Sequence, residues 1–188
     1  MLFKVMGEDS ITTKAYIILF TCAATRAVHL ELVSDLTSQT FLNAFRRFTS
    51  RQGLPQIMLS DNATTFLNMA NYLDEIKNDP LTNNHLSSIN CEWRFIPARA
   101  PWFDAIWKRL IGILKAGLRK VLGRALVNFD ELHTILTELE ATINDRPLTY
   151  ANSDFNELEP ITPSQLIRGR RLKTFPNTLT DELTDPPI

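Results

Sequence analysis

The chain has 188 residues, of which 44% are hydrophobic, and its 20 basic and 21 acidic residues leave a formal net charge of −1. This size and composition predict one globular domain with its own core and exclude a wholly disordered chain. The near-neutral balance also excludes nucleic-acid binding through overall charge, so such a function would need local clusters of basic residues. No apolar run is long enough to cross a bilayer, and the apolar start is too short for a signal peptide. We therefore expect a soluble intracellular protein without a membrane partner.

The first half of the chain alternates between strand and helix patterns. Residues 14–32 are rich in β-branched and aromatic side chains on both sides of a short Ala-Thr-Arg connection, which predicts a hairpin. Residues 34–51 carry apolar side chains at helical spacing, and either Thr37 or Ser38 can cap that helix. The apolar run at 56–59 predicts a buried strand, and residues 64–77 predict a second helix.

The second half continues this alternation as far as its C-terminal extension. Residues 78–88 are polar and predict a surface loop, 91–96 predict a strand, and 102–122 and 129–144 predict two long helices. The order predicts an α/β domain over residues 1–150, with a mixed sheet flanked by helices. Residues 151–188 are rich in proline and acidic side chains, which predicts an extended or partly disordered extension.

The two cysteines, Cys22 and Cys91, lie far apart and show no CxxC spacing. This pattern predicts neither a disulfide framework nor a zinc site, and we expect both to be reduced core thiols. The histidines are His29, His85 and His133, and they show no metal-ligand spacing either. No catalytic role is therefore assigned to them.

Asp61 stands where the predicted strand at 56–59 gives way to the next helix. A carboxylate in this position can hold a hard divalent cation. It can equally cap the helix without any metal, because aspartate favours that place in every fold. Its neighbours Asn62 and Thr64 are expected to shape the turn.

The helix at 102–122 has two faces with different side chains. The apolar face is expected to be core and comprises Leu110, Ile113, Leu114, Gly117 and Val121. Near the opposite side, Lys108, Lys115 and Arg119 form a basic stripe that can follow a phosphate backbone, although a solvated surface is the simpler interpretation. A short basic run at 168–171 is open to the same two interpretations.

Among the tryptophans, Trp93 and Trp107 are expected in the core, while Trp102 is a candidate for stacking on a base.

Several segments in family order resemble the integrase core of BEL/Pao-type long-terminal-repeat retrotransposons, a ribonuclease H-like polynucleotidyl transferase. The resemblance covers roughly residues 1–172. Its most specific segments are Thr25-Arg26-Ala27-Val28-His29-Leu30-Glu31, Ser60-Asp61-Asn62-Ala63-Thr64-Thr65-Phe66, Arg99-Ala100-Pro101-Trp102-Phe103 and Asn144-Asp145-Arg146-Pro147-Leu148-Thr149. It implies a ribonuclease H-like fold in which two Asp and one Glu hold two Mg²⁺ or Mn²⁺ ions for phosphoryl transfer.

Only one of those three carboxylates has a match in this chain. Asp61 matches the second Asp, whereas the family's first Asp would precede Leu2, so the resemblance implies a truncated first strand. Lys108 stands at the position of the Glu, and its ammonium would repel a metal ion. Asp104, one helical turn earlier, is a weak compensating candidate, but an ion pair with Lys108 or hydrogen bonds from amides at the helix start are favoured.

The resemblance implies DNA as partner, the nucleus as location, homo-oligomer formation and an inherited role in DNA integration. With the site incomplete, the sequence predicts a catalytically inactive copy with doubtful metal binding. The alternatives are a non-catalytic module that binds DNA or a partner protein, and a decayed fragment without activity. Residual metal-dependent nuclease activity through Asp61 and Asp104 is the enzymatic alternative.

Overall fold

The computed structural model describes residues 2–6, 12–78, 91–97, 101–150 and 160–171, and at 2–4, 6, 12, 72–78, 101–106 and 150 it describes the backbone only. The elements are β1 (Leu2–Met6), β2 (Thr12–Thr21), β3 (Val28–Val33), α1 (Ser38–Gln52), β4 (Ile57–Ser60), α2 (Thr64–Asn78), β5 (Glu92–Phe95), α3 (Pro101–Leu122), α4 (Phe129–Asn144), β6 (Thr149–Tyr150), β7 (Pro160–Ile161) and α5 (Pro163–Arg168). No helix among them is long and apolar enough to cross a membrane.

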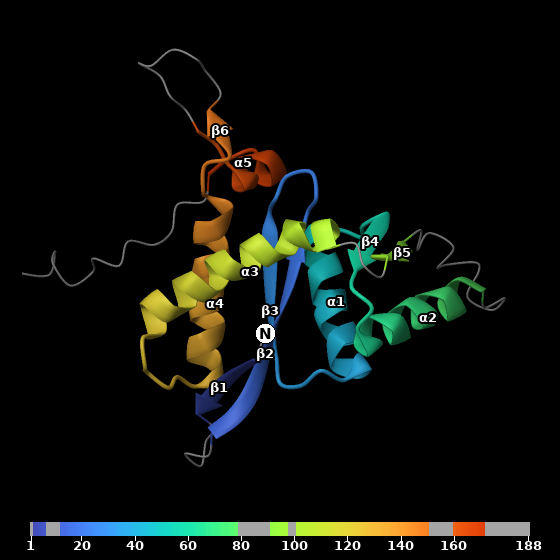
Figure 1. The fold of residues 1–188 in the computed structure, drawn as a ribbon, viewed down its shortest axis with the longest axis horizontal. Helices are drawn as coiled ribbons and strands as arrows, with labels where there is room; N and C mark the ends of the chain where they lie inside the picture. The colour runs from blue at the N-terminus through green and yellow to red at the C-terminus, as the bar shows by residue number, and fades with distance from the viewer. Residues whose placement is uncertain (1, 7–11, 79–90, 98–100, 151–159, 172–188) are drawn as a thin grey trace, which may run out of the picture.

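The strands that the structure describes form three separate sheets. β1, β2 and β3 make an antiparallel sheet, β4 pairs with β5 in parallel, and β6 pairs with β7. The predicted hairpin is confirmed as β2 and β3, and the predicted α/β class is confirmed by this arrangement of strands and helices (Figure 1). The loop expected at 78–88 lies almost wholly outside the described residues.

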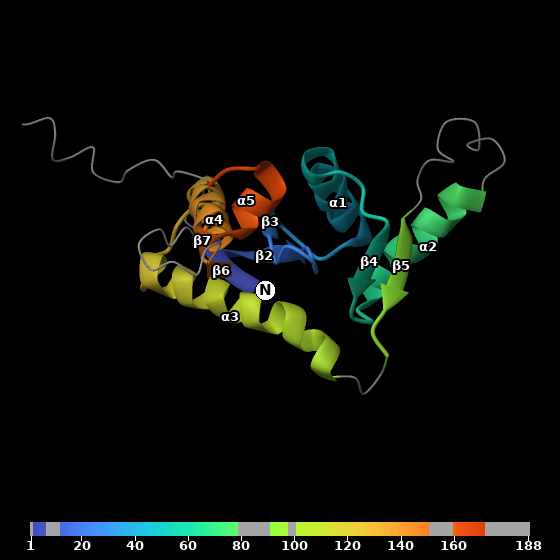
Figure 2. The same cartoon turned by 90° about the horizontal axis from the view of Figure 1, so that it is seen from above.

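Helices cover both faces of the three-stranded sheet, α3 on one side and α1 on the other (Figure 2). Alternation along the strands divides the side chains between two clusters. Ile17 and Leu30 pack with Leu114 of α3 and Leu132 of α4, whereas Phe20 packs with an aromatic group on the opposite face. That second cluster contains Phe20, Phe41, Phe45 and Met69, with Phe48, Phe66 and Trp93 packed against it.

The helix ends follow the expected chemistry. Thr37 caps α1 by accepting a hydrogen bond from the Thr40 amide, and Asn128 forms a capping box with Glu131 at the start of α4. Gly117 permits a close approach of α3 to α4, because a Cβ there would lie 2.9 Å from a Leu139 methyl carbon.

The apolar face predicted for α3 is partly wrong. Leu110 and Leu114 are buried, and so is Leu118, which the pattern did not select. Ile113 is 39% exposed and Val121 is 56% exposed. The reason is that α3 contacts the core along one narrow i, i+4 row of side chains, so residues one position away from that row face solvent.

Two further expectations need correction or refinement. Cys91 is buried as expected, but Cys22 is exposed because it begins the turn that joins β2 to β3.

Within the C-terminal extension, residues 160–168 form β7 and α5, and a capping box between Thr162 and Gln165 starts that helix. Thr162 is buried, and α5 contacts α4.

Candidate functional site

Asp61 lies in the turn between β4 and α2, where its side chain is exposed. Its Oδ1 accepts a hydrogen bond from the Ala63 amide at 3.1 Å, so one carboxylate oxygen shapes the turn. The strand end before it is fixed by Trp93, whose Nε1 donates to Ser60 Oγ at 2.9 Å. Asn62 secures the other side by donating to the Ile96 carbonyl at 3.3 Å. The turn-shaping role expected of Asn62 is therefore confirmed.

Asp61 and the early part of α3 face one cavity of about 770 Å³. Asp61 lines it from the turn after β4, and Trp107 and Ile111 line it from α3. Trp107 is half-buried at this wall, not fully enclosed in the core. Lys108, the next residue, is exposed on α3. Asp61 and Trp107, which lie far apart in sequence, thus line the same cavity, while the joint role of Asp61 and Lys108 stays a prediction.

The described side chains do not fit a pair of catalytic metal ions. Among them, no group of three His, Cys, Asp or Glu residues converges where a metal ion could be held. Asp61 supplies one carboxylate that already accepts an amide, and Lys108 supplies a cation. Two divalent ions need several oxygen ligands, so we derive no metal-dependent step from this arrangement. The backbone of Asp104 and Trp102 is helical, but their side chains lie outside the described part of α3, so their roles stay predictions.

The basic stripe of α3 is on the surface. Lys108, Lys115 and Arg119 are all exposed, and Arg119 Nε donates to the Lys115 carbonyl at 3.2 Å. That bond ties the Arg119 side chain to the backbone one turn earlier in the same helix. The stripe runs along the side of α3 away from Leu110 and Leu114, as the helical spacing predicted.

A cluster of arginines near the β2–β3 turn was missed by the sequence analysis. Arg146, just after α4, donates from Nη2 to the Arg26 carbonyl at 2.8 Å and from Nη1 to the Ile143 carbonyl. Burial lowers the pKa of Arg146, and the nearby charges of Arg26 and Arg109 lower it further. The three arginines come from three separate segments, so no local motif indicates that they lie close together.

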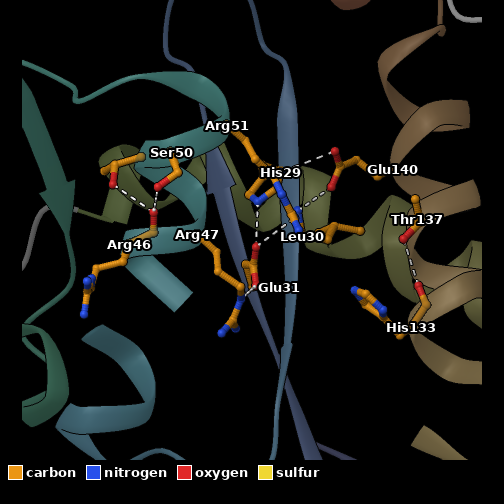
Figure 3. A network of polar contacts seen from close by, with 11 residues as sticks. His29, Leu30, Glu31, Arg46, Arg47, Ser50, Arg51, His133, Thr137 and Glu140 are labelled. Carbon is orange, nitrogen blue, oxygen red and sulfur yellow. Dashed lines mark hydrogen bonds and ion pairs between the residues drawn. The ribbon is translucent and has the colours of Figure 1, made fainter. Parts of the chain in front are cut away.

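A buried charge network, also missed from sequence, joins β3 to α1 and α4 (Figure 3). His29 Nε2 lies 3.0 Å from Glu31 Oε1, and His29 Nδ1 lies 3.4 Å from Glu140 Oε1, which is an ion-pair distance. Arg47 Nε contacts Glu31 at 2.6 Å, and Arg51 Nη1 contacts it at 3.2 Å. Glu31 is 3% exposed, so its charge depends on these partners.

The network changes the pKa of both buried partners. Burial lowers the pKa of His29, but its contacts with the Glu140 and Glu31 carboxylates outweigh this and raise it to about 9. Burial raises the pKa of Glu31, but hydrogen bonds from His29 and Arg47, together with their charges, produce a net lowering. His29 is therefore a cation at neutral pH and Glu31 an anion, so the network pairs opposite charges between β3, α1 and α4.

No protein-family model matches the chain, and no curated protein matches it. Among solved structures, the HTLV-2 integrase catalytic core domain in complex with magnesium aligns with a TM-score of 0.55 and 17% identity over 89% of this chain and 92% of that chain. The fold is that of an integrase catalytic core. The BIV integrase catalytic core domain aligns with a TM-score of 0.54 and 12% identity over 88% and 90% of the two chains.

A third similar structure belongs to a larger assembly. It is the simian T-cell lymphotropic virus intasome in complex with the PP2A regulatory subunit B56 gamma, with a TM-score of 0.59 and 16% identity over 94% of this chain. This chain spans about half of that one, 55% of its length. The ribonuclease H-like integrase fold expected from the sequence is thus confirmed, while the BEL/Pao type stays a prediction.

Proposed function

We propose that this chain is an integrase core-type domain of the BEL/Pao retrotransposon kind that binds DNA and does not catalyse strand transfer. The observation that carries the proposal is the exposed stripe of Lys108, Lys115 and Arg119 on α3. The integrase-like fold supports an inherited role in DNA integration. The magnesium in one similar structure belongs to that protein and suggests which ion to test here.

The electrostatics of α3 favour DNA binding over catalysis. Exposed cations in a row can each displace a counterion from a phosphate backbone, which gives sequence-independent affinity. Lys108 adds to this row, whereas a carboxylate at its position would repel DNA unless a metal ion were bound. The proposed partners of the chain are retrotransposon DNA ends and target DNA. The proposal therefore includes a nuclear location, and it also includes homo-oligomer formation.

Charge reversal on α3 tests DNA binding. The double variant Lys115→Glu, Arg119→Glu is expected to bind a fluorescent DNA duplex at least about tenfold more weakly in an anisotropy titration. The slope of log affinity against log salt should become shallower by about 2, because two phosphate contacts are lost. The matched control is Lys14→Glu, Arg46→Glu, which makes the same charge change at exposed positions on β2 and α1. Equal losses of DNA affinity in both variants would mean that only net charge matters and would reject the stripe as the DNA-binding surface.

A nicking assay tests the inactivity. With Mg²⁺ or Mn²⁺ present, the chain is expected to cleave or join DNA no faster than its Asp61→Asn variant, because Lys108 opposes metal binding. Metal-dependent activity that is present in the original chain and lost in Asp61→Asn would overturn the proposal. Activity gained only on Lys108→Glu would support both the inherited site and its loss.

A further inference from the structure

The region around the β2–β3 turn gathers three arginines from three separate segments. They are Arg26 of the turn, Arg109 of α3 and Arg146 just after α4, and we call them the arginine cluster. Close to each of them in sequence is a buried residue of one core cluster, and these core residues are Val28, Leu110 and Ile143. Figure 1 shows the turn at the same end of the molecule as the C-terminal end of α4. The core therefore holds the three segments together at this end.

Arg146 is the fixed member of the arginine cluster. Its Nη2 donates to the Arg26 carbonyl at 2.8 Å, and its Nη1 donates to the Ile143 carbonyl. These carbonyls orient the guanidinium but carry no net charge, so they leave its positive charge unpaired. Further N–H donors remain on the half-buried guanidinium, because it has more donors than these carbonyls use.

The acidic residues that precede Arg146 most closely in sequence are engaged elsewhere. Asp145 Oδ2 lies 2.7 Å from Arg171 Nη2, and its Oδ1 accepts from Arg171 Nε at 3.1 Å. Glu140 Oε1 lies 3.4 Å from His29 Nδ1 in the buried network. Neither carboxylate forms an ion pair with Arg146. The positive charge of Arg146 is therefore not balanced by its neighbours on α4.

The whole arginine cluster carries uncompensated positive charge. No carboxylate in the part of the chain that the structure describes forms an ion pair with Arg26, Arg109 or Arg146. Burial lowers the pKa of Arg146, and the charges of Arg26 and Arg109 lower it further, which shows that these charges lie near one another. Like charges held close together repel, and a bound anion would relieve that repulsion.

The backbone at Arg26 does not call for an arginine. Its φ is 59°, and no other non-glycine residue that the structure describes has a positive φ. Glycine or asparagine adopts this left-handed conformation more easily than a long side chain does. The side chain of Arg26 is exposed, so core packing does not require it either. What arginine adds at this position is its charge and its forked donors.

The chemistry of three guanidinium groups matches a terminal phosphate group. Such a group carries about two negative charges at neutral pH and presents three strong acceptor oxygens. Guanidinium forks donate paired hydrogen bonds to phosphate oxygens, and bonds between charged partners are the stronger ones. A carboxylate has a single charge, and the phosphodiesters of a DNA backbone spread single charges along its length. A compact group of three cations therefore favours the doubly charged anion.

We propose that the arginine cluster is a binding site for a terminal phosphate group, with Arg146 as the fixed donor and Arg26 and Arg109 as exposed donors that close on the anion. The group belongs either to a free phosphate compound or to the 5′ end of a DNA strand. Arg109 lies about 100° around α3 from Lys108, to one side of the basic stripe. The site does not depend on that stripe, so its failure would leave the proposed function standing.

Pyrophosphate is the probe for a test on the intact chain at neutral pH and physiological salt. Nuclear magnetic resonance of the arginine Nε–H groups should show a saturable shift at Arg146, with a dissociation constant below about 1 mM. Arg26→Gln and Arg109→Gln should each weaken binding at least about tenfold, since each removes a charged donor. Arg124→Gln, the same change at an exposed position after α3, should weaken it less than about twofold. The absence of saturable binding, or an equal loss in Arg124→Gln, would overturn the proposal.

Competing ligands identify the anion and its source. Citrate offers several carboxylates in place of phosphates, and binding as tight as that of pyrophosphate would overturn the assignment to phosphate. A 5′-phosphorylated oligonucleotide that displaces pyrophosphate at least about tenfold better than its 5′-hydroxyl form would support a DNA end as the source. Equal displacement by the two forms would support a free phosphate compound.

The basic stripe supplies the last control. Lys115→Glu, Arg119→Glu should keep its affinity for pyrophosphate within about twofold, because salt screens charges beyond about 8 Å. A loss as large as that in Arg109→Gln would show one continuous basic surface and would overturn the separate site.

Discussion

Replacement of Glu31 by glutamine is expected to lower the free energy of unfolding by about 3 kcal/mol. The amide has nearly the same shape but no charge, so the buried His29 cation and the guanidinium of Arg47 lose their shared anion. Removing one member of a buried ion network costs more than the net value of the network, because the remaining charges stay desolvated. Urea unfolding at neutral pH, followed by circular dichroism, measures the difference.

The matched control is Glu138→Gln, which removes the same charge from an exposed position on α4. It should change the free energy of unfolding by less than about 0.5 kcal/mol. A similar small effect at Glu31 would show that water solvates the network in solution and that its buried geometry contributes little.

The same network predicts how stability depends on pH. The pKa of His29 rises from its ordinary value of 6.5 to about 9 on folding, so its contribution is fully present below about pH 6.5 and is lost as pH rises through 9. The pKa of Glu31 is lowered, so its contribution is present above its ordinary value of 4.5 and is lost as pH falls below it. Unfolding curves from pH 5 to 10 should show a fall on the alkaline side. That fall should be smaller in Glu31→Gln, since His29 then keeps Glu140 as its one carboxylate partner.

The replacement Asn144→Ala is expected to cost about 3 kcal/mol of stability, because two buried backbone groups lose their partners. Asn144 Oδ1 accepts from the Val28 amide, and Asn144 Nδ2 donates to the Val28 carbonyl, both at 2.7 Å. Glu140 adds a third such contact by accepting from the Leu30 amide at 2.7 Å. Together these α4 side chains occupy the edge of β3 that faces away from β2.

Thermal and urea unfolding of Asn144→Ala should be compared with those of Asn71→Ala, an exposed position on α2 where the change is expected to be near neutral. Light scattering should also show faster aggregation of Asn144→Ala, since an uncovered strand edge can pair with another chain. An unfolding free energy equal to that of the original chain would mean that water replaces the Asn144 side chain at the edge of β3.

Secondary structure was largely predictable because its signals are local. Helix α4 begins and ends where its Asn128 cap and apolar spacing indicated, and Asp61 lies in the expected turn between strand and helix. The segment at 160–168 was missed because its proline content suggested an extended chain, although proline in the first turn of a helix is favourable. In α3 the spacing indicated an apolar side but not which row of it would meet the core.

The sequence by itself determined the alternating strands and helices, the place of Asp61, and the cation at Lys108 within a basic stripe. These features depend on residue type and on spacing over a few positions. The tertiary structure alone decided which distant residues meet. Asn144 and Val28 are 116 positions apart, and Glu140 and Leu30 are 110 apart. It also decided that β2 and β4 line one cavity, because no local sequence pattern relates segments so far apart.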